Sequence, residues 1–192
     1  PGPGIYQVTL IAGSSPVCLD TATVTVPIGE PILLSATHSD SLCIDQFFSF
    51  DAQVSGPAGT TYWWDFGPNA TPSVSNQLTG NSVLFNQNGT LQVLLIGQNS
   101  LCIDTLVEVV RVFGHPNIDF VFVNSLQCAP SEAQFVNLSQ SDVPTTYIWN
   151  LGDGTEVQGT SIFHTYSLPG NYTVTLTLMQ QYGCMDTLFM AQ

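Results

Sequence analysis

The feature that most limits how this chain can fold is an internal repeat. The pattern Cys-x-Asp-Thr occurs three times, at 18–21, 102–105 and 184–187. A glycine precedes each copy at almost the same distance from its cysteine, and these glycines, Gly4, Gly89 and Gly170, follow one another at a nearly constant interval. Recurrence at a nearly fixed period predicts one supersecondary unit that the chain uses several times.

A second block of residues recurs twice with matching distances. It consists of a cysteine, then a phenylalanine, then a tryptophan: Cys43, Phe50 and Trp64, and again Cys128, Phe135 and Trp149. The two blocks divide the chain into the last part of a first repeat (1–30), a complete second repeat (31–113) and a nearly complete third repeat (114–192). Short proline-containing junctions separate the repeats, which predicts a semi-rigid string of domains.

The hydrophobic pattern within a repeat is that of β-strands. Between 172 and 178, apolar or aromatic residues alternate with threonines, which is the period of a half-buried strand. Turn-forming groups such as Gly152-Asp153-Gly154 and Leu168-Pro169-Gly170 separate the runs, and no window shows a helical period. About seven short strands in some 80 residues are typical of an immunoglobulin-like sandwich. We predict an all-β fold of tandem Ig-like β-sandwiches in a row.

The five cysteines follow the repeat. The second and third repeats each carry an early and a late cysteine, whereas the first keeps only its late one, Cys18. We therefore predict two bridges within repeats, Cys43–Cys102 and Cys128–Cys184, with the partner of Cys18 outside this sequence. Such bridges stabilise by about 4 kcal/mol in the chain-entropy model and indicate an oxidising, extracytoplasmic compartment. Free cysteines or metal ligands are the alternative, but the chain has no Cys-x-x-Cys pair, so zinc is poorly supported.

Charge excludes several classes of partner. The chain has 14 acidic residues, no lysine and a single arginine, Arg111, which gives a formal net charge of −13. Nucleic acids and anionic lipid headgroups are bound by clusters of basic residues, so neither is expected as a partner. No apolar run reaches the roughly 18 residues that a membrane-spanning helix requires. The first residue is not a methionine and no signal peptide follows, which is typical of an internal piece of a longer protein.

The third repeat resembles the PKD (polycystic-kidney-disease-type) repeat. The PKD pattern runs through an aromatic residue, Trp and Gly-Asp-Gly, then His-x-Tyr, then Pro-Gly-x-Tyr-x-Val. The matching segments are Tyr147–Gly154, His164–Tyr166 and Pro169–Val174. In the second repeat, Trp64-Asp65-Phe66-Gly67 keeps the core pattern while the turns differ. The resemblance implies an Ig-like sandwich that works as an extracellular spacer or interaction module.

The resemblance also implies a biological setting. Repeats with this cysteine pair and a late Cys-x-Asp-Thr are similar to tandem repeats in very large surface proteins of gliding bacteria, including motility adhesins exported by type IX secretion. Similar domains stand beside secreted hydrolases. We therefore expect a non-catalytic, extracellular structural or adhesive segment on the cell surface. Its partners would be neighbouring repeats, surface polysaccharide, or secretion and anchoring proteins. The alternative is an accessory spacer or carbohydrate-binding module of a secreted polysaccharide hydrolase or protease.

Two kinds of aromatic residue are candidates for ligand contact. Trp64 and Trp149 stand in mid-strand at a fixed distance from a cysteine, which favours a core position near the disulfide. Trp63 neighbours Trp64, so strand alternation sends it to the opposite face, toward solvent, where it is a candidate contact for carbohydrate or protein. His164 belongs to the His-x-Tyr of the resembled family, and no nucleophile motif accompanies the histidines, so we expect no catalysis.

The remaining candidates are modification and cation sites. Asp followed by Ser or Thr and an apolar residue resembles the acceptor of periplasmic O-glycosylation in gliding bacteria, which makes Thr21, Ser41, Thr105 and Thr187 possible acceptors. The competing interpretation is that these are ordinary strand residues repeated with the unit. We expect no cofactor. The one alternative is a calcium ion that bridges carboxylates at a junction between repeats, for example Glu30 with Asp104 or Glu108.

Overall fold

The protein is built of strands and turns. The computed structural model describes residues 2–15, 18–123, 128–141 and 143–191, and contains no helix among them. It follows that no described helix is long and apolar enough to cross a membrane. The alternation of apolar and polar side chains predicted this all-β class, and the prediction is confirmed.

The chain separates into two compact units. The first consists of Pro1–Asp40, Phe47–Asn86 and Thr90–Val110, and the second of Ser41–Gln46, Gln87–Gly89 and Arg111–Gln192. Three short segments of the second sequence repeat thus belong to the second unit, namely Ser41–Gln46, Gln87–Gly89 and 111–113, and the most important of these is Ser41–Gln46. The division of the sequence into three repeats stays a prediction.

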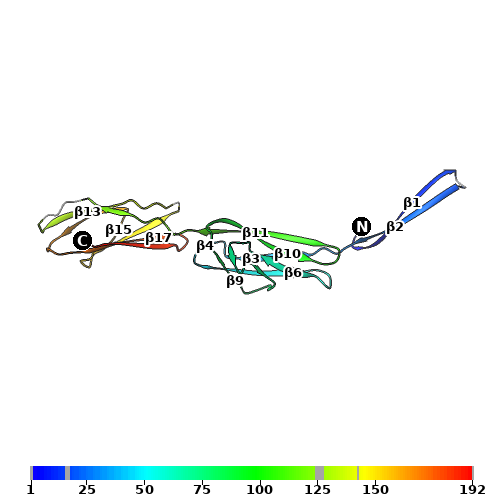
Figure 1. The fold of residues 1–192 in the computed structure, drawn as a ribbon, viewed down its shortest axis with the longest axis horizontal. Coiled ribbons are helices and arrows are strands. Elements are labelled where there is room, and N and C mark those ends of the chain that lie inside the picture. Colours follow the sequence, from blue (N-terminus) through cyan, green and yellow to red (C-terminus); the bar gives the residue numbers. More distant parts are fainter. Residues whose placement is uncertain (1, 16–17, 124–127, 142, 192) are drawn as a thin grey trace. The chain divides into compact units, whose positions relative to one another are not determined.

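The first unit contains a two-layer sandwich (Figure 1). One sheet has the order β3-β5-β9-β7 and the other contains β11-β10-β6-β8. Their bounds are β3 (Leu33–His38), β5 (Phe47–Ser55), β6 (Thr61–Asp65), β7 (Ala70–Thr71), β8 (Val74–Ser75), β9 (Asn81–Phe85), β10 (Gly89–Gln98) and β11 (Ile103–Phe113). The core between the two sheets is aromatic. The ring centroids of Phe50 and Trp64 are 5.6 Å apart, and the ring of Trp64 stacks on the ring of Phe66.

The first thirty residues form a hairpin of their own. β1 (Gly4–Ser15) and β2 (Cys18–Ile28) make a two-stranded antiparallel sheet, shown in blue in Figure 1. Its apolar side chains are open to solvent: Leu10 is 67% exposed, whereas Leu95, which holds the matching position after the glycine of β10, is fully buried. The hairpin therefore has the side chains of a sandwich strand pair, but no sheet of the described residues covers it as one covers β10 and β11.

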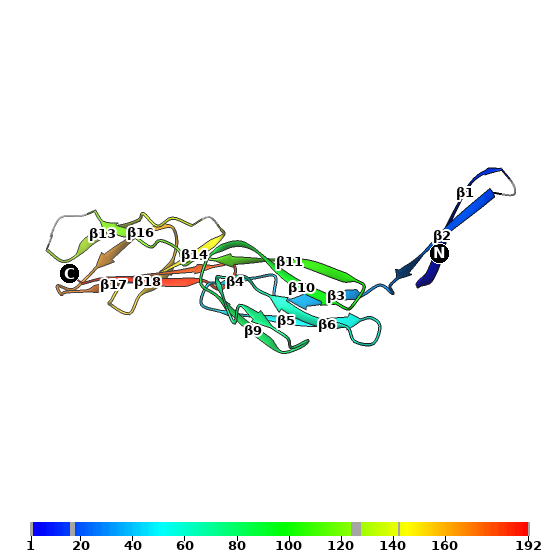
Figure 2. The ribbon, with the colours of Figure 1, turned by 45° about the vertical axis from the view of Figure 1, so that its right-hand side comes forward.

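The second unit contains a second sandwich (Figure 2). β13 and β16 lie in one layer, with order β12-β13-β16, and β17 and β18 in the other, with order β15-β14-β17-β18. Their bounds are β12 (Phe120–Phe122), β13 (Ser131–Asn137), β14 (Thr145–Asn150), β15 (Glu156–Gln158), β16 (Ser161–Tyr166), β17 (Thr173–Gln180) and β18 (Met185–Ala191). The core between the layers is centred on Trp149, with Phe120 edge-on to it at 5.1 Å.

A short strand completes the second unit. β4 (Ser41–Cys43) runs parallel to the end of β11, and the register pairs Arg111 with Ser41 and Phe113 with Cys43. The amide of Ile44 then donates to the carbonyl oxygen of Phe113 at 2.9 Å. This pairing takes Cys43 out of the surroundings of its own sequence repeat.

Candidate functional site

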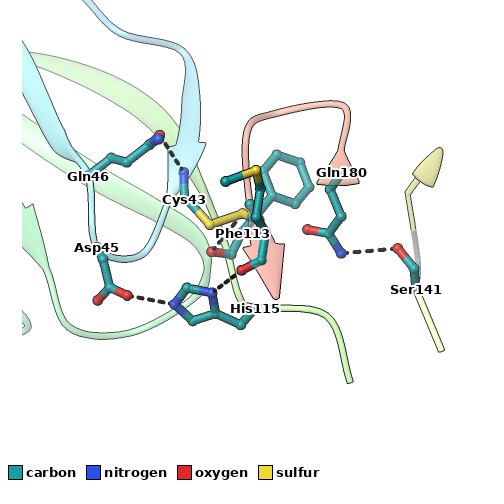
Figure 3. The surroundings of a disulfide bond; sticks show 9 residues. Cys43, Asp45, Gln46, Phe113, His115, Ser141 and Gln180 are labelled. Atoms are coloured by element: carbon teal, nitrogen blue, oxygen red, sulfur yellow. Dashed lines mark hydrogen bonds and ion pairs between the residues drawn. A yellow bond between two sulfur atoms is a disulfide. The ribbon is translucent and has the colours of Figure 1, made fainter. Parts of the chain in front are cut away.

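The second unit is closed by a disulfide between Cys43 and Cys184 (Figure 3). Cys43 ends β4, and Cys184 stands in the turn between β17 and β18. Both cysteines are buried together with Phe113, and the ring of Tyr182 stacks on the ring of Phe113 with 4.2 Å between centroids. The bridge and its aromatic cover thus form a small apolar cluster apart from the main core.

The predicted bridge between Cys43 and Cys102 is wrong. Cys43 pairs with Phe113 at the end of β11, whereas Cys102 immediately precedes the first residue of the same strand. A strand advances about 3.3 Å per residue, which places the two cysteines roughly 36 Å apart along it. A disulfide requires Cα atoms within about 7 Å, and those of Cys43 and Cys184 are 5.2 Å apart.

The predicted bridge between Cys128 and Cys184 is wrong for the same reason. Cys128 lines a pocket together with Val174 and Met190, which face each other at one end of the β17–β18 hairpin. Cys184 lies in the turn at the other end, at least about 17 Å further along the strands. Cys102 and Cys128 are free cysteines, half-buried and exposed respectively, and the side chain of Cys18 lies outside what the structure describes.

Polar contacts surround the disulfide. His115 Nε2 donates to Asp45 Oδ2 at 2.5 Å, and its Nδ1 lies 3.3 Å from the carbonyl oxygen of Met185 (Figure 3). The hydrogen bond to Asp45 is the main cause that raises the pKa of His115 above its ordinary value. The side-chain oxygen of Gln46 accepts from the amide of Cys43 at 3.2 Å. These bonds hold the loop after β4 against the β17–β18 turn.

A second candidate site is an open apolar pocket in the second unit, of about 550 Å³. Its walls include Phe122, Phe135 and Tyr166, and the exposed free cysteine Cys128 also lines it. Apolar pockets of this size are common ligand or partner sites.

The Gly-Asp-Gly turn is tied to the rest of the sandwich by a histidine and a tyrosine. Asp153 Oδ2 lies 2.7 Å from His164 Nε2, and the hydroxyl of Tyr166 donates to the carbonyl oxygen of Leu151 at 2.8 Å. Despite opposing desolvation, the hydrogen bonds from His164 and Thr155 hold the pKa of Asp153 below its usual range. Burial raises the pKa of Tyr166 to about 12. His164 therefore fixes a turn, which agrees with the structural role that the sequence indicated.

The tryptophans divide as strand alternation predicts. Trp64 and Trp149 are fully buried, so the predicted core position is confirmed, although the disulfide belongs to a separate cluster. Trp63 points to the other face, where its side chain is half-buried and so only partly open to solvent. Its cross-strand neighbour there is Ile96, itself buried, and such pairs cover each other.

The three Cys-x-Asp-Thr segments share a local geometry. In each, the aspartate Oδ1 accepts from the amide of the next threonine, at 2.9 Å for Thr21 and Thr105 and 2.8 Å for Thr187. Thr21, Thr105 and Thr187 are exposed, as expected of an acceptor, whereas Ser41 is half-buried in β4. Glycosylation of any of the four stays a hypothesis.

One of the carboxylates proposed for calcium takes part in another contact. Glu108 contacts the ring of His38, with Nε2 and Oε2 3.3 Å apart. Within the described ranges, no three His, Cys, Asp or Glu side chains gather in a way that would hold a metal ion.

Comparison with known proteins identifies the domain type of the second unit. Residues 115–190 match the PKD domain family, so the chain contains a PKD domain. The PKD1 domain of Vibrio anguillarum Epp is 22% identical, with a TM-score of 0.36, and the match covers 41% of this chain and 90% of that one. The PKD1 domain of the Vibrio cholerae metalloprotease PrtV is 25% identical, with a TM-score of 0.36 and coverage of 41% and 94%.

A longer match confirms the fold over nearly the whole chain. Extracellular domains 3–5 of Drosophila OTK are 12% identical, with a TM-score of 0.51, and the match covers 98% of this chain and 70% of that one. At this identity the likeness shows the fold alone. The disulfide and the PKD domain together fit an extracellular domain.

Two parts of the site were not predicted from the sequence. The parallel pairing of β4 with β11 involves three residues, too few to leave a periodic signal. The Cys43–Cys184 pairing follows from it. A signal was available in the sequence, because Cys102 and Cys184 stand in hairpin turns at the opposite end of their strands from the early cysteines.

Proposed function

We propose that this chain is a non-catalytic, extracellular stalk segment of a large secreted cell-surface protein, built from tandem PKD-like sandwiches. The protein it serves is an adhesion or gliding-motility protein exported by type IX secretion. The stalk carries a binding region away from the cell surface and holds it there under load.

The observation that carries this proposal is the combination of a repeated hairpin with a covalent bond between repeats. The hairpins β1–β2, β10–β11 and β17–β18 each lead into or contain a Cys-x-Asp-Thr copy at nearly the same distance from a glycine. The disulfide then joins a cysteine of the second sequence repeat to a cysteine of the third. A recurring module with linked copies is what a load-bearing spacer requires.

The bond sets a limit on extension under force. Cys43 and Cys184 are separated by 141 residues, and this stretch cannot lengthen while the bond is intact. A fully extended chain spans at most about 3.4 Å per residue, so the bond withholds roughly 480 Å of extension. Only the residues outside the bridge are free to extend when the domains unfold.

Single-molecule pulling of the chain by its two ends tests the mechanical part of the proposal. The oxidised chain should reach a much shorter final length than the reduced chain, with a difference of about 480 Å. The Cys43→Ser variant should behave like the reduced chain under both conditions. Equal final lengths before and after reduction would show that the bond carries no load.

Replacement within the surface protein tests the spacer role itself. If residues 31–192 act as a stalk, their deletion should reduce attachment of cells to a surface. Substitution by unrelated β-sandwiches of equal length should restore attachment. Failure of an equally long, well-expressed replacement would contradict a spacer role and favour specific binding by this segment.

The alternative role as a carbohydrate-binding module rests on Trp63. Its half-buried ring offers less stacking surface than a fully exposed one, so the structure does not favour this role. A glycan array compares the chain with its Trp63→Ala variant. Binding that disappears in the variant would make the chain a binding module, and absence of binding would remove this alternative.

A further inference from the structure

The two free cysteines stand at the repeat positions of the two bonded ones. Cys43 is the early cysteine of the second repeat, and Cys128 is the early cysteine of the third. Cys184 is the late cysteine of the third repeat, and Cys102 is the late cysteine of the second. Among the cysteines whose side chains the structure describes, the observed bond therefore joins an early cysteine to the late cysteine of the next repeat and leaves one unpaired cysteine of each kind.

We propose that each repeat is bonded to the next in this way, and that the pocket beside Cys128 is the seat for the cysteine-bearing hairpin turn of a following repeat. This inference rests on the proposed function, because it requires the repeats to continue in tandem. The occupant is a further copy of the β17–β18 turn, Gln181–Cys184, whose own copy is seated beside Cys43.

The surroundings of the two early cysteines support this assignment. Where a turn is seated, Cys43 is only 3% exposed, and Tyr182 from the turn stacks on Phe113 beside it. Where no turn is seated, Cys128 is exposed and borders an apolar pocket of about 550 Å³. Burial of such a pocket by an apolar turn is favourable, because it removes apolar surface from water.

The surroundings of the two late cysteines support it independently. Cys184 Sγ lies 3.8 Å from the carbonyl oxygen of Phe113, the residue eleven positions after the preceding late cysteine. Gly29 is the residue eleven positions after Cys18, and a Cβ atom placed on it would lie 2.5 Å from Cys102 Sγ. The thiol of Cys102 thus lies against the same point of the preceding junction as the bonded sulfur of Cys184.

Formation of each bond needs an oxidant, which a small-molecule disulfide of the extracytoplasmic compartment supplies. One thiolate attacks that disulfide and forms a mixed disulfide, and the first thiol leaves. The second thiolate then attacks the protein sulfur of the mixed disulfide and releases the second thiol. Two protein thiols lose two electrons and two protons, and one small disulfide is reduced to two thiols.

The test is a chain extended by one repeat. Residues 111–192 are appended after Gln192. Gln192 stands as many positions after Cys184 as Val110 stands after Cys102, so the appended copy reproduces the natural junction. Met185→Leu in the appended copy alone gives its cysteine peptide a distinct mass. The chain is oxidised in a glutathione buffer, digested without reduction by an endoprotease that cleaves at acidic residues, and analysed by mass spectrometry.

We expect Cys128 to be linked to the appended copy of Cys184, with the original Cys43–Cys184 bond retained. The extended chain has seven cysteines, so two bonds leave three thiols, and reaction of Cys128 with a thiol reagent should fall at least tenfold relative to the original chain. Cys128→Ser should release the appended thiol, whereas the matched variant Cys102→Ser should leave the new bond unchanged.

Three outcomes would overturn the proposal when circular dichroism shows the extended chain to be folded. These are an appended Cys184 that stays reduced, a bond within the appended copy, and covalent dimers through Cys128. None of them affects the replacement experiment, which judges the spacer role separately. A stalk without these bonds and a chain that is no stalk are thereby distinguished.

Discussion

The Gly-Asp-Gly turn offers the sharpest test of how the PKD domain is built. Gly152 has a φ of +79°, and a Cβ atom on it would lie 2.6 Å from the carbonyl oxygen of Thr173 and 2.9 Å from its amide nitrogen. Gly154 in the same turn has a φ of +92°, but a Cβ atom there would meet nothing within 4 Å. Alanine at the two positions therefore separates backbone conformation from steric fit.

The expected costs follow from these geometries. A side chain in the left-handed region costs about 1–2 kcal/mol at either position. At Gly152 the contact is far shorter than a normal van der Waals contact and its partner is backbone, so overpacking adds about 1–3 kcal/mol. Gly152→Ala should therefore lower the free energy of unfolding of the PKD domain by about 2–5 kcal/mol, and Gly154→Ala by about 1–2 kcal/mol.

Urea denaturation followed by circular dichroism and tryptophan fluorescence measures both variants. Only the transition of the second unit should move, and Gly152→Ala should move it further. The NMR chemical shifts of the His164 ring add a local readout, because displacement of the turn would lengthen the contact between Asp153 and His164. Equal destabilisation by the two variants would refute the steric argument and leave backbone conformation as the whole effect.

Three further outcomes are expected. Cys43→Ser should lower the stability of the second unit by up to about 5 kcal/mol, the chain-entropy value for a bridge spanning 141 residues, as measured by the urea midpoint. The contact with Asp45 raises the pKa of His115, so it stabilises the fold fully below pH 6.5, and this stabilisation is lost as the pH rises through the raised pKa. His115→Asn should flatten this pH dependence. Urea midpoints of both proteins at about pH 6 and 8.5 measure it. Burial raises the pKa of Tyr166 to about 12, so the neutral phenol stabilises the fold fully below pH 10, and this stabilisation is lost as the pH rises through 12. Tyr166→Phe should remove the phenolate step near pH 12 from an absorbance titration.

Much of the fold is readable from the sequence, because the responsible signals are local and periodic. Alternation places Trp64 and Trp149 in the cores and turns Trp63 to the other face. The recurring glycine and Cys-x-Asp-Thr mark hairpins in each copy. The half-buried state of Trp63 was not readable, because it depends on Ile96, which lies on another strand.

The choice of disulfide partners shows where such reading ends. The sequence by itself determined that the cysteines come in early and late kinds, one of each in a complete repeat. The tertiary structure alone decided that an early cysteine bonds to the late cysteine of the next repeat. Membership of a repeat says nothing about position along a strand, and at about 3.3 Å per residue the two ends of a strand are separated by far more than a sulfur–sulfur bond can span.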